Sequence, residues 1–179
     1  MSIRITGGSL GGRFISSPEG RQTRPTSSLT RQALCNILGE RIPSARVLDL
    51  YAGSGVISCE WISRGALEAV LVEQAPVVAK LIRRNMESLG VTKQARIVQG
   101  DVLRLLQNPQ TLASFDLIYA DPPFVSTYPD LRPALALLNP EGMAIFEMPS
   151  RRLPDWSREA MDLRRYGESS LAFFQPKLG

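Results

Sequence analysis

Regular alternation between short apolar runs and stretches of helical periodicity constrains the fold of this chain most. Five apolar runs have the length and composition of buried strands, at residues 46–50, 68–73, 95–99, 115–120 and 142–148. Four stretches between them have helical character, at residues 55–64, 75–89, 101–107 and 127–138. Such alternation indicates βαβ units, so we expect an α/β fold with a mostly parallel sheet covered on both faces. Two later β-type runs, at 160–165 and 170–175, predict a closing antiparallel hairpin.

The first 41 residues form a basic segment that does not follow this alternation. Residues 3–6 and 13–16 are short β-type runs around two glycine pairs and predict a hairpin, and a helix is expected to begin at Ser27 or Ser28. The segment holds six arginines and two glutamates, so it carries the whole net charge of +4. We interpret residues 1–41 as an extension that contacts a polyanion and residues 42–179 as the main domain. The alternative is a solvated arm that only aids solubility.

Composition excludes several classes of function. The chain has no histidine, which rules out histidine-based triads, imidazole bases and the usual catalytic zinc sites. No stretch approaches the roughly 20 apolar residues of a membrane span, and the N-terminus lacks the apolar region of a signal peptide. Cys35 and Cys59 each lie within a predicted helix, so we expect reduced thiols and a cytoplasmic protein without a bound metal.

Acidic residues follow four successive strands of the predicted sheet and indicate a single site. These residues, each at the carboxyl end of a strand, are Asp49, Glu73, Asp101 and Asp121. Parallel strands bring their carboxyl ends to one rim, where open α/β sheets bind ligands. Glu73 and Asp101 can each be interpreted instead as a helix-capping residue. Four such acids in one register nevertheless favour a shared function.

A glycine-containing loop, Ala52-Gly53-Ser54-Gly55, joins the first parallel strand to the next helix. Its glycines let the backbone approach a ligand closely and leave free N–H donors at the helix start. A G-x-G pattern alone is a weak signal, but Asp49 would repel a pyrophosphate and attract the α-ammonium of an amino acid. A cationic amino-acid cofactor therefore fits better than a dinucleotide. Glu73 is placed to contact ribose hydroxyls, and Asp101 an adenine amino group.

The tetrapeptide Asp121-Pro122-Pro123-Phe124 follows the fourth parallel strand. Two prolines end the strand abruptly and stiffen the backbone, because each fixes φ and neither donates an N–H. An acid, two free carbonyls and an aromatic ring at the rim suit the holding of a flat base by its amino group. An ordinary Pro-Pro turn with a core Phe is the alternative.

Together these features resemble the RsmD family of S-adenosylmethionine-dependent methyltransferases, which methylate the N2 amine of one guanine, at position 966, in 16S ribosomal RNA. The matching elements are Asp49-x-Tyr51-x-Gly53-x-Gly55, Glu73, Gly100-Asp101, Asp121-Pro122-Pro123-Phe124, Arg4-Ile5-x-Gly7-Gly8 and Arg24-Pro25-Thr26. The resemblance implies a Rossmann-like fold with a mostly parallel seven-stranded sheet, and S-adenosylmethionine as cofactor. The implied partner is 16S rRNA, within a partly or fully assembled small ribosomal subunit.

The resemblance also implies roles for individual residues. The residues expected to carry the transfer are Asp121, Pro122 and Phe124. The residues expected to bind the cofactor are Asp49, Tyr51, Gly53, Ser54, Gly55, Glu73, Gln74, Asp101 and Val102. The residues expected to bind RNA are Arg4, Arg13, Arg24, Thr26 and Arg31. This chain departs from the family at Ser28-Leu29, where the family has an Asp-Arg pair.

Two other functions remain open. One is an N6-adenine methyltransferase on RNA or DNA, since the Asp-Pro-Pro-aromatic motif also serves that chemistry. The other is a non-catalytic RNA-binding module on the same fold. The intact Asp49, Gly53, Gly55 and Asp121 favour an active enzyme.

Overall fold

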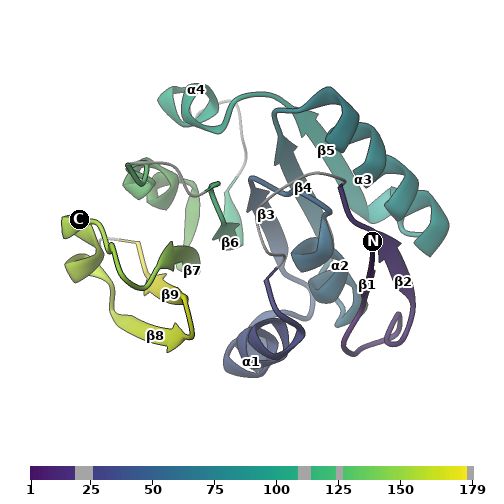
Figure 1. The fold of residues 1–179 in the computed structure, drawn as a ribbon, viewed down its shortest axis with the longest axis horizontal. Helices are drawn as coiled ribbons and strands as arrows, with labels where there is room; N and C mark the ends of the chain where they lie inside the picture. Colours follow the sequence, from purple (N-terminus) through teal and green to yellow (C-terminus); the bar gives the residue numbers. More distant parts are fainter. Residues whose placement is uncertain (19–25, 109–113, 124–126, 177–179) are drawn as a thin grey trace.

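A computed structural model describes residues 1–18, 26–108, 114–123 and 127–176. Its centre is a seven-stranded sheet of order β5-β4-β3-β6-β7-β9-β8 (Figure 1). The strands are β3 (Arg46–Leu50), β4 (Glu68–Glu73), β5 (Ala95–Gln99), β6 (Phe115–Ala120), β7 (Leu138–Pro149), β8 (Asp162–Tyr166) and β9 (Ser169–Phe174). Neighbouring strands from β5 to β7 are parallel, and β9 is antiparallel to both β7 and β8. The predicted α/β fold with its closing hairpin is confirmed.

Side chains that alternate along the strands divide the core into two apolar layers. The helices that cover them are α1 (Ser28–Leu38), α2 (Val56–Ser63), α3 (Pro76–Leu89) and α4 (Val102–Gln107). Val47 and Leu117 belong to the layer under α1, α2 and α3. Leu48 and Ile118, one position further along the same strands, belong to the layer under α4. The central strands β3, β4 and β6 are thus buried on both faces, as their continuous apolar sequences require.

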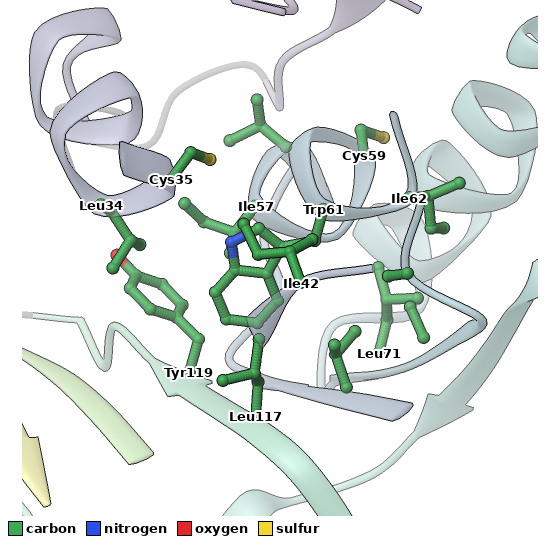
Figure 2. Packing of buried hydrophobic residues seen from close by; sticks show 14 of the residues in the cluster. Leu34, Cys35, Ile42, Ile57, Cys59, Trp61, Ile62, Leu71, Leu117 and Tyr119 are labelled. Atoms are coloured by element: carbon green, nitrogen blue, oxygen red, sulfur yellow. The ribbon is translucent and has the colours of Figure 1, made fainter. Parts of the chain in front are cut away.

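Figure 2 shows the layer beneath α1 and α2. Trp61 of α2 is fully buried, and its ring meets Tyr119 edge-to-face with the centroids 6.2 Å apart. Leu34 and Cys35 of α1 pack in the same cluster. Burial raises the pKa of the Cys35 thiol to about 11, which keeps it protonated and unreactive.

The N-terminal extension has the predicted elements. Strands β1 (Ser2–Arg4) and β2 (Phe14–Ser16) pair antiparallel as a separate two-stranded sheet, which lies beside α3 (Figure 1). The side chain of Ser27 caps α1 by accepting a hydrogen bond from Thr30 N at 3.1 Å. Ile3 and Ile15 of the hairpin enter the same core layer as α1 and α2. The described part of the extension therefore shares one core with the main domain.

The segment before β7 differs from the prediction. Instead of a helix over 127–138, the described residues contain the short 3-10 segment η4 (Arg132–Leu137). Pro129 and Pro133 account for this, because proline removes a backbone donor and clashes with the preceding helical turn. The strand predicted over 142–148 is longer than expected, and residues 139–142 lie within β7 as a bulge, since the pairing with β6 passes from Leu138 directly to Met143.

No helix in the described parts of the chain is both long enough and apolar enough to span a membrane.

Candidate active site

The strand order brings the four predicted acids to one rim. The strands β5, β4, β3 and β6 are adjacent and parallel. Asp49 lies within β3, Glu73 ends β4, Asp101 follows β5, and Asp121 follows β6. The carboxyl ends of four neighbouring strands therefore each present one carboxylate, as the alternation of strands and helices predicted.

The loop between β3 and α2 is held in an unusual backbone conformation. Tyr51, Gly53 and Gly55 all have positive φ, at 63°, 57° and 79°. For tyrosine this conformation costs free energy, about 1–3 kcal/mol, which is tolerated where the surroundings enforce it. A Cβ atom at Gly55 would lie 3.0 Å from Met86 Cε, so a side chain there would force Met86 to shift. Glycine is thus favoured at this position both by its conformation and by its packing.

Glu73 fixes this loop from the neighbouring strand. Its carboxylate accepts hydrogen bonds from Gly53 N at 3.1 Å and from Ala75 N at 2.9 Å. The capping role considered for Glu73 is therefore present, together with a direct contact to the glycine loop. The loop is also tied to β4 by Ala52 N, which donates to Val72 O at 2.9 Å.

Asp49 is the most perturbed acid at the rim. Its side chain is 2% exposed, and Ser58 Oγ donates a hydrogen bond to it at 2.7 Å. Burial raises the pKa of Asp49 to about 7, although the Ser58 hydrogen bond acts in the opposite direction. A charged ligand group next to Asp49 would therefore decide its ionisation near neutral pH. Ser58 was not predicted as a site residue, because its role depends on the first turn of α2 facing back toward β3.

Asp101 caps a helix and also acts on a neighbouring tyrosine. It caps α4, since its side chain accepts a hydrogen bond from Arg104 N at 2.8 Å, as the alternative interpretation expected. Its charge also acts on half-buried Tyr51: burial and then the Asp101 carboxylate raise the pKa of the Tyr51 phenol to about 12. Among the other predicted cofactor residues, Ser54 and Val102 are buried and Gln74 is exposed.

Asp121 and Pro122 begin the loop after β6. Asp121 is half-buried and Pro122 is buried, whereas Phe124 lies outside the described residues. Burial and then the charge of Asp121 raise the pKa of the Tyr128 phenol well above its usual value. The Tyr128 hydroxyl donates to Glu147 O at 2.8 Å, which ties the chain after the motif to β7.

A buried polar cluster lies at Tyr119, on the strand that leads to Asp121. The Glu147 carboxylate accepts hydrogen bonds from Tyr119 at 2.5 Å and from Thr26 at 2.9 Å, and the Thr26 and Tyr119 hydroxyl oxygens are 3.2 Å apart. Glu147 is 4% exposed. Tyr119 lies two residues before Asp121, so this cluster connects the start of α1 to the strand that ends at the motif. Neither Tyr119 nor Glu147 was predicted, because their partner Thr26 is remote in sequence.

The residues expected to bind RNA divide into exposed and buried groups. Arg4 and Arg13 are exposed, and Arg24 lies outside the described residues. Arg31 is 3% exposed and forms an ion pair with Glu60 at 3.0 Å, so its guanidinium is engaged within the protein, and its contact with RNA stays a prediction. Thr26 is 8% exposed and its hydroxyl donates to Glu147, so the RNA contact expected of it also stays a prediction.

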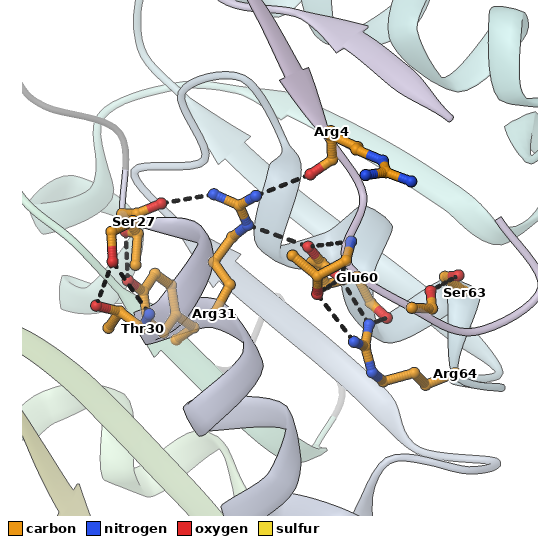
Figure 3. Close-up of polar contacts among 11 residues, drawn as sticks. Arg4, Ser27, Thr30, Arg31, Glu60, Ser63 and Arg64 are labelled. Carbon is orange, nitrogen blue, oxygen red and sulfur yellow. Dashed lines mark hydrogen bonds and ion pairs between the residues drawn. The ribbon is translucent and has the colours of Figure 1, made fainter. Parts of the chain in front are cut away.

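Figure 3 shows why Arg31 lies inside the molecule. Its guanidinium also donates to Thr26 O and Arg4 O, at 2.6 and 2.8 Å. Its partner Glu60 accepts further hydrogen bonds from Thr6 and Arg64. Because the pair is buried and satisfied, removing one member would leave an uncompensated charge, at a cost of about 3–5 kcal/mol. This cluster joins the extension to α2.

A groove of about 670 Å³ lies between the hairpin and the start of α1. The residues that line it are Met1 to Thr6, Gly11, Gly12, Thr26 to Ser28, Arg31 and Gln32. Exposed Arg4 gives it positive charge. Thr26 belongs both to the groove and to the Glu147 cluster, so one side chain links the groove to the cluster that contains Tyr119 of β6.

The chemistry of the rim fits a cationic cofactor. Carboxylates at 49, 73 and 101 lie around the glycine loop, and acids in this arrangement favour an ammonium, ribose hydroxyls and an adenine amine over a pyrophosphate. Within the described ranges, no three or more His, Cys, Asp or Glu side chains are grouped so that they could hold a metal ion.

Comparisons with known proteins agree with this geometry. The family described as "Conserved hypothetical protein 95" matches residues 3–175. Ribosomal RNA small subunit methyltransferase D of Escherichia coli K12 is 34% identical over 122 residues, which cover 68% of this chain and 60% of that protein.

Solved structures extend the similarity to the whole chain. The Escherichia coli protein yhhF is 28% identical with a TM-score of 0.84, over 100% of both chains. The Thermus thermophilus 16S rRNA N2 G1207 methyltransferase, solved with AdoMet and guanosine, is 23% identical with a TM-score of 0.72, over 99% of this chain and 50% of that one. At that identity the second similarity concerns the fold, which is the fold of S-adenosylmethionine-dependent methyltransferases.

Proposed function

The chain belongs to the RsmD family, described as "Conserved hypothetical protein 95", and on this premise we propose that it is an S-adenosylmethionine-dependent methyltransferase of small-subunit ribosomal RNA. The observation that carries the proposal is the convergence of Asp49, Glu73, Asp101 and Asp121 on one rim, next to a glycine loop. At the finer level, we propose the N2 amine of a guanine in 16S rRNA, at position 966, as the acceptor. The reaction takes place in the cytoplasm, on a partly or fully assembled subunit.

Three acids would hold the cofactor. Asp49 pairs with the α-ammonium, Glu73 accepts hydrogen bonds from ribose hydroxyls, and Asp101 accepts one from the adenine amine. When bound, S-adenosylmethionine supplies a methyl group on a positively charged sulfur, and its transfer to an amine releases S-adenosylhomocysteine and one proton. Since the donor is already activated, the protein mainly aligns the reactants, which is worth roughly 7–11 kcal/mol in well-oriented intramolecular reactions.

Asp121 and Pro122 would hold the acceptor amine. An aromatic amine is a poor nucleophile because its lone pair is delocalised into the ring. The Asp121 carboxylate and the Pro122 carbonyl oxygen accept its two hydrogens and direct the nitrogen lone pair toward the methyl group. Asp121 takes up the released proton. Phe124 stacks on the base, a contact worth about 1–3 kcal/mol, and the base must leave its own stack to enter.

The groove beside the hairpin is the proposed path of the RNA backbone. Arg4 lines it and is exposed, so its guanidinium is available for a phosphate. Thr26, which lines the groove, also contacts Tyr119, two residues before Asp121. A chain of nucleotides in the groove would therefore lead to the transfer site.

Transfer of labelled methyl from S-adenosylmethionine to small-subunit RNA, followed by nucleoside analysis, tests this proposal. Naked 16S rRNA and partly assembled subunits are compared as substrates. N2-methylguanosine at one site supports the proposed reaction. N6-methyladenosine would preserve the fold and cofactor but contradict the proposed base, and the absence of product on both substrates would favour a non-catalytic RNA-binding module.

A further inference from the structure

A buried side-chain amide joins the N-terminal hairpin to the glycine loop at residues 52–55, hereafter the cofactor loop. Asn85 lies on α3 and is 3% exposed. Its Oδ1 accepts a hydrogen bond from Ser16 N at 3.0 Å, and its Nδ2 donates to Ser16 O at 2.9 Å. The same Nδ2 donates to Ser54 O at 3.0 Å. Ser16 belongs to β2 and Ser54 to the glycine loop, so one side chain contacts both.

The chemistry of the amide makes this a rigid connection. A carboxamide is planar, and its nitrogen carries two N–H donors in fixed directions. One N–H is donated to Ser16 O of the hairpin and the other to Ser54 O of the loop. The amide therefore fixes the positions of these two carbonyl oxygens relative to each other. Because the amide is buried, a movement of either carbonyl leaves a donor unsatisfied, which costs about 1–3 kcal/mol.

The surroundings of Asn85 strengthen the link on both sides. The next residue, Met86, packs against the loop so closely that a Cβ atom at Gly55 would lie 3.0 Å from its Cε. On the hairpin side, Arg13 donates to the last carbonyls of α3, Ser88 O at 2.5 Å and Leu89 O at 3.0 Å. The helix α3 is therefore held between the hairpin and the loop.

We propose that Asn85 is a positioning residue that couples the hairpin to the cofactor loop. Cofactor that orders the loop also orders the hairpin, and RNA that holds the hairpin tightens the binding of cofactor. Coupling between two sites is reciprocal in binding free energy. The part that concerns RNA rests on the proposed function, whereas the coupling of loop and hairpin does not.

Amide hydrogen exchange of residues 1–17 tests the coupling without RNA. Saturating S-adenosylhomocysteine should slow exchange of the hairpin amides in the wild-type protein by about fivefold or more, the lower range of allosteric coupling. In Asn85→Ala the same addition should leave hairpin exchange unchanged. If Asn85→Ala does not fold, Asn85→Asp replaces it, since it keeps the Oδ1 acceptor and loses both donors.

Arg13→Ala is the matched control. It loosens the same junction between hairpin and α3 but leaves the amide link intact, so hairpin exchange becomes faster and still responds to the cofactor. A merely structural role of Asn85 would accelerate exchange with and without cofactor alike and preserve the ratio. That result, or a wild-type hairpin that ignores saturating cofactor, would overturn the inference.

The RNA arm compares the dissociation constant of S-adenosylmethionine with and without bound 16S rRNA. RNA should lower it about fivefold in the wild type and leave it unchanged in Asn85→Ala. If RNA does not bind while the cofactor still protects the hairpin, the proposed function fails and the coupling stands. If RNA binds and is methylated without any change in cofactor affinity, the coupling fails and the function stands.

Discussion

The rim has a proposed cofactor side, around Asp49 and Glu73, and a proposed target side, around Asp121 and the Glu147 cluster. The residues that contact each other are close in sequence on the first side and far apart in sequence on the second. On the cofactor side, Ser58 contacts Asp49 across nine positions and Gly53 contacts Glu73 across 20. On the target side, Thr26 contacts Tyr119 across 93 positions and Glu147 across 121. The cofactor side is thus a product of consecutive βα units, whereas the target side is assembled from the extension, β6 and β7.

This difference separates the expected effects of substitution. Changes on the cofactor side should act on cofactor affinity, because their contacts lie within the loop that meets the ligand. Changes on the target side should act on transfer or RNA binding and leave the cofactor affinity of the RNA-free protein unchanged. A substitution on one side that changed both cofactor affinity and RNA binding in separate assays would contradict this separation.

Asp121→Ala should have the largest effect. Without the carboxylate, one hydrogen of the acceptor amine loses its acceptor and the proton loses its destination, so the transfer rate should fall by about 10²–10⁴-fold. The dissociation constant of S-adenosylmethionine should stay unchanged in calorimetry. Asp121→Asn is the control, because its side-chain oxygen still accepts one hydrogen and should retain part of the rate. Wild-type activity in Asp121→Ala would refute the assignment.

Gly55→Ala should destabilise the cofactor side. The added Cβ meets Met86, Leu71 and Ile82 within 3.3 Å while φ is +79°. Overpacking costs about 1–3 kcal/mol and a left-handed alanine about 1–2 kcal/mol, so denaturant unfolding should show a loss near 3 kcal/mol, with weaker cofactor binding. Gly90→Ala is the control: its φ is +75° with nothing within 4 Å, so only the conformational cost applies. Equal losses in both variants would contradict the packing argument.

Asp49 should make cofactor affinity depend on pH. Its pKa is raised to about 7 by burial, from an ordinary value of about 3.9. In the free protein this carboxyl therefore favours folding when protonated, and its contribution to stability is lost as pH rises from about 4 to about 7. The ammonium of the cofactor needs the ionised form, so affinity should weaken about fivefold from pH 7 to pH 6, as the ionised fraction falls. Titration calorimetry of wild type and Asp49→Asn checks this, since the variant should be nearly independent of pH.

Arg4→Ala should have the smallest effect and should leave the cofactor side untouched. Loss of one phosphate contact should weaken RNA binding uniformly and reduce the slope of log affinity against log salt by about one. Arg165→Ala on β8 is the matched control, because it removes an exposed arginine at the far edge of the sheet. If both variants lose the same affinity, the groove has no special role and the arginines act only through net charge.

The sequence was most informative where structure follows from local patterns. The strands β3, β4, β5 and β6 occupy the predicted residues, because a buried parallel strand is a continuous apolar run. The prediction of a helix over 127–138 was wrong: the apolar residues there have helical spacing, but Pro129 and Pro133 disfavour an α-helix. Ser58, Asn85 and Glu147 were not predicted as site residues, since each is an ordinary polar residue until its distant partner is known.

The arginines of the extension illustrate the same limit. Composition shows that they carry the net charge of the chain, but Arg4 is exposed while Arg31 is buried against Glu60. Nothing in their local surroundings in the chain distinguishes them, because a buried ion pair depends on which helix packs against which.

Local periodicity and turn residues were sufficient to place four acids at the ends of parallel strands and a glycine loop between them. Tertiary packing alone decided which polar side chains turn inward. A strand or turn is specified by neighbours a few positions away, whereas a buried hydrogen bond between Thr26 and Glu147 exists only after elements 121 positions apart have met.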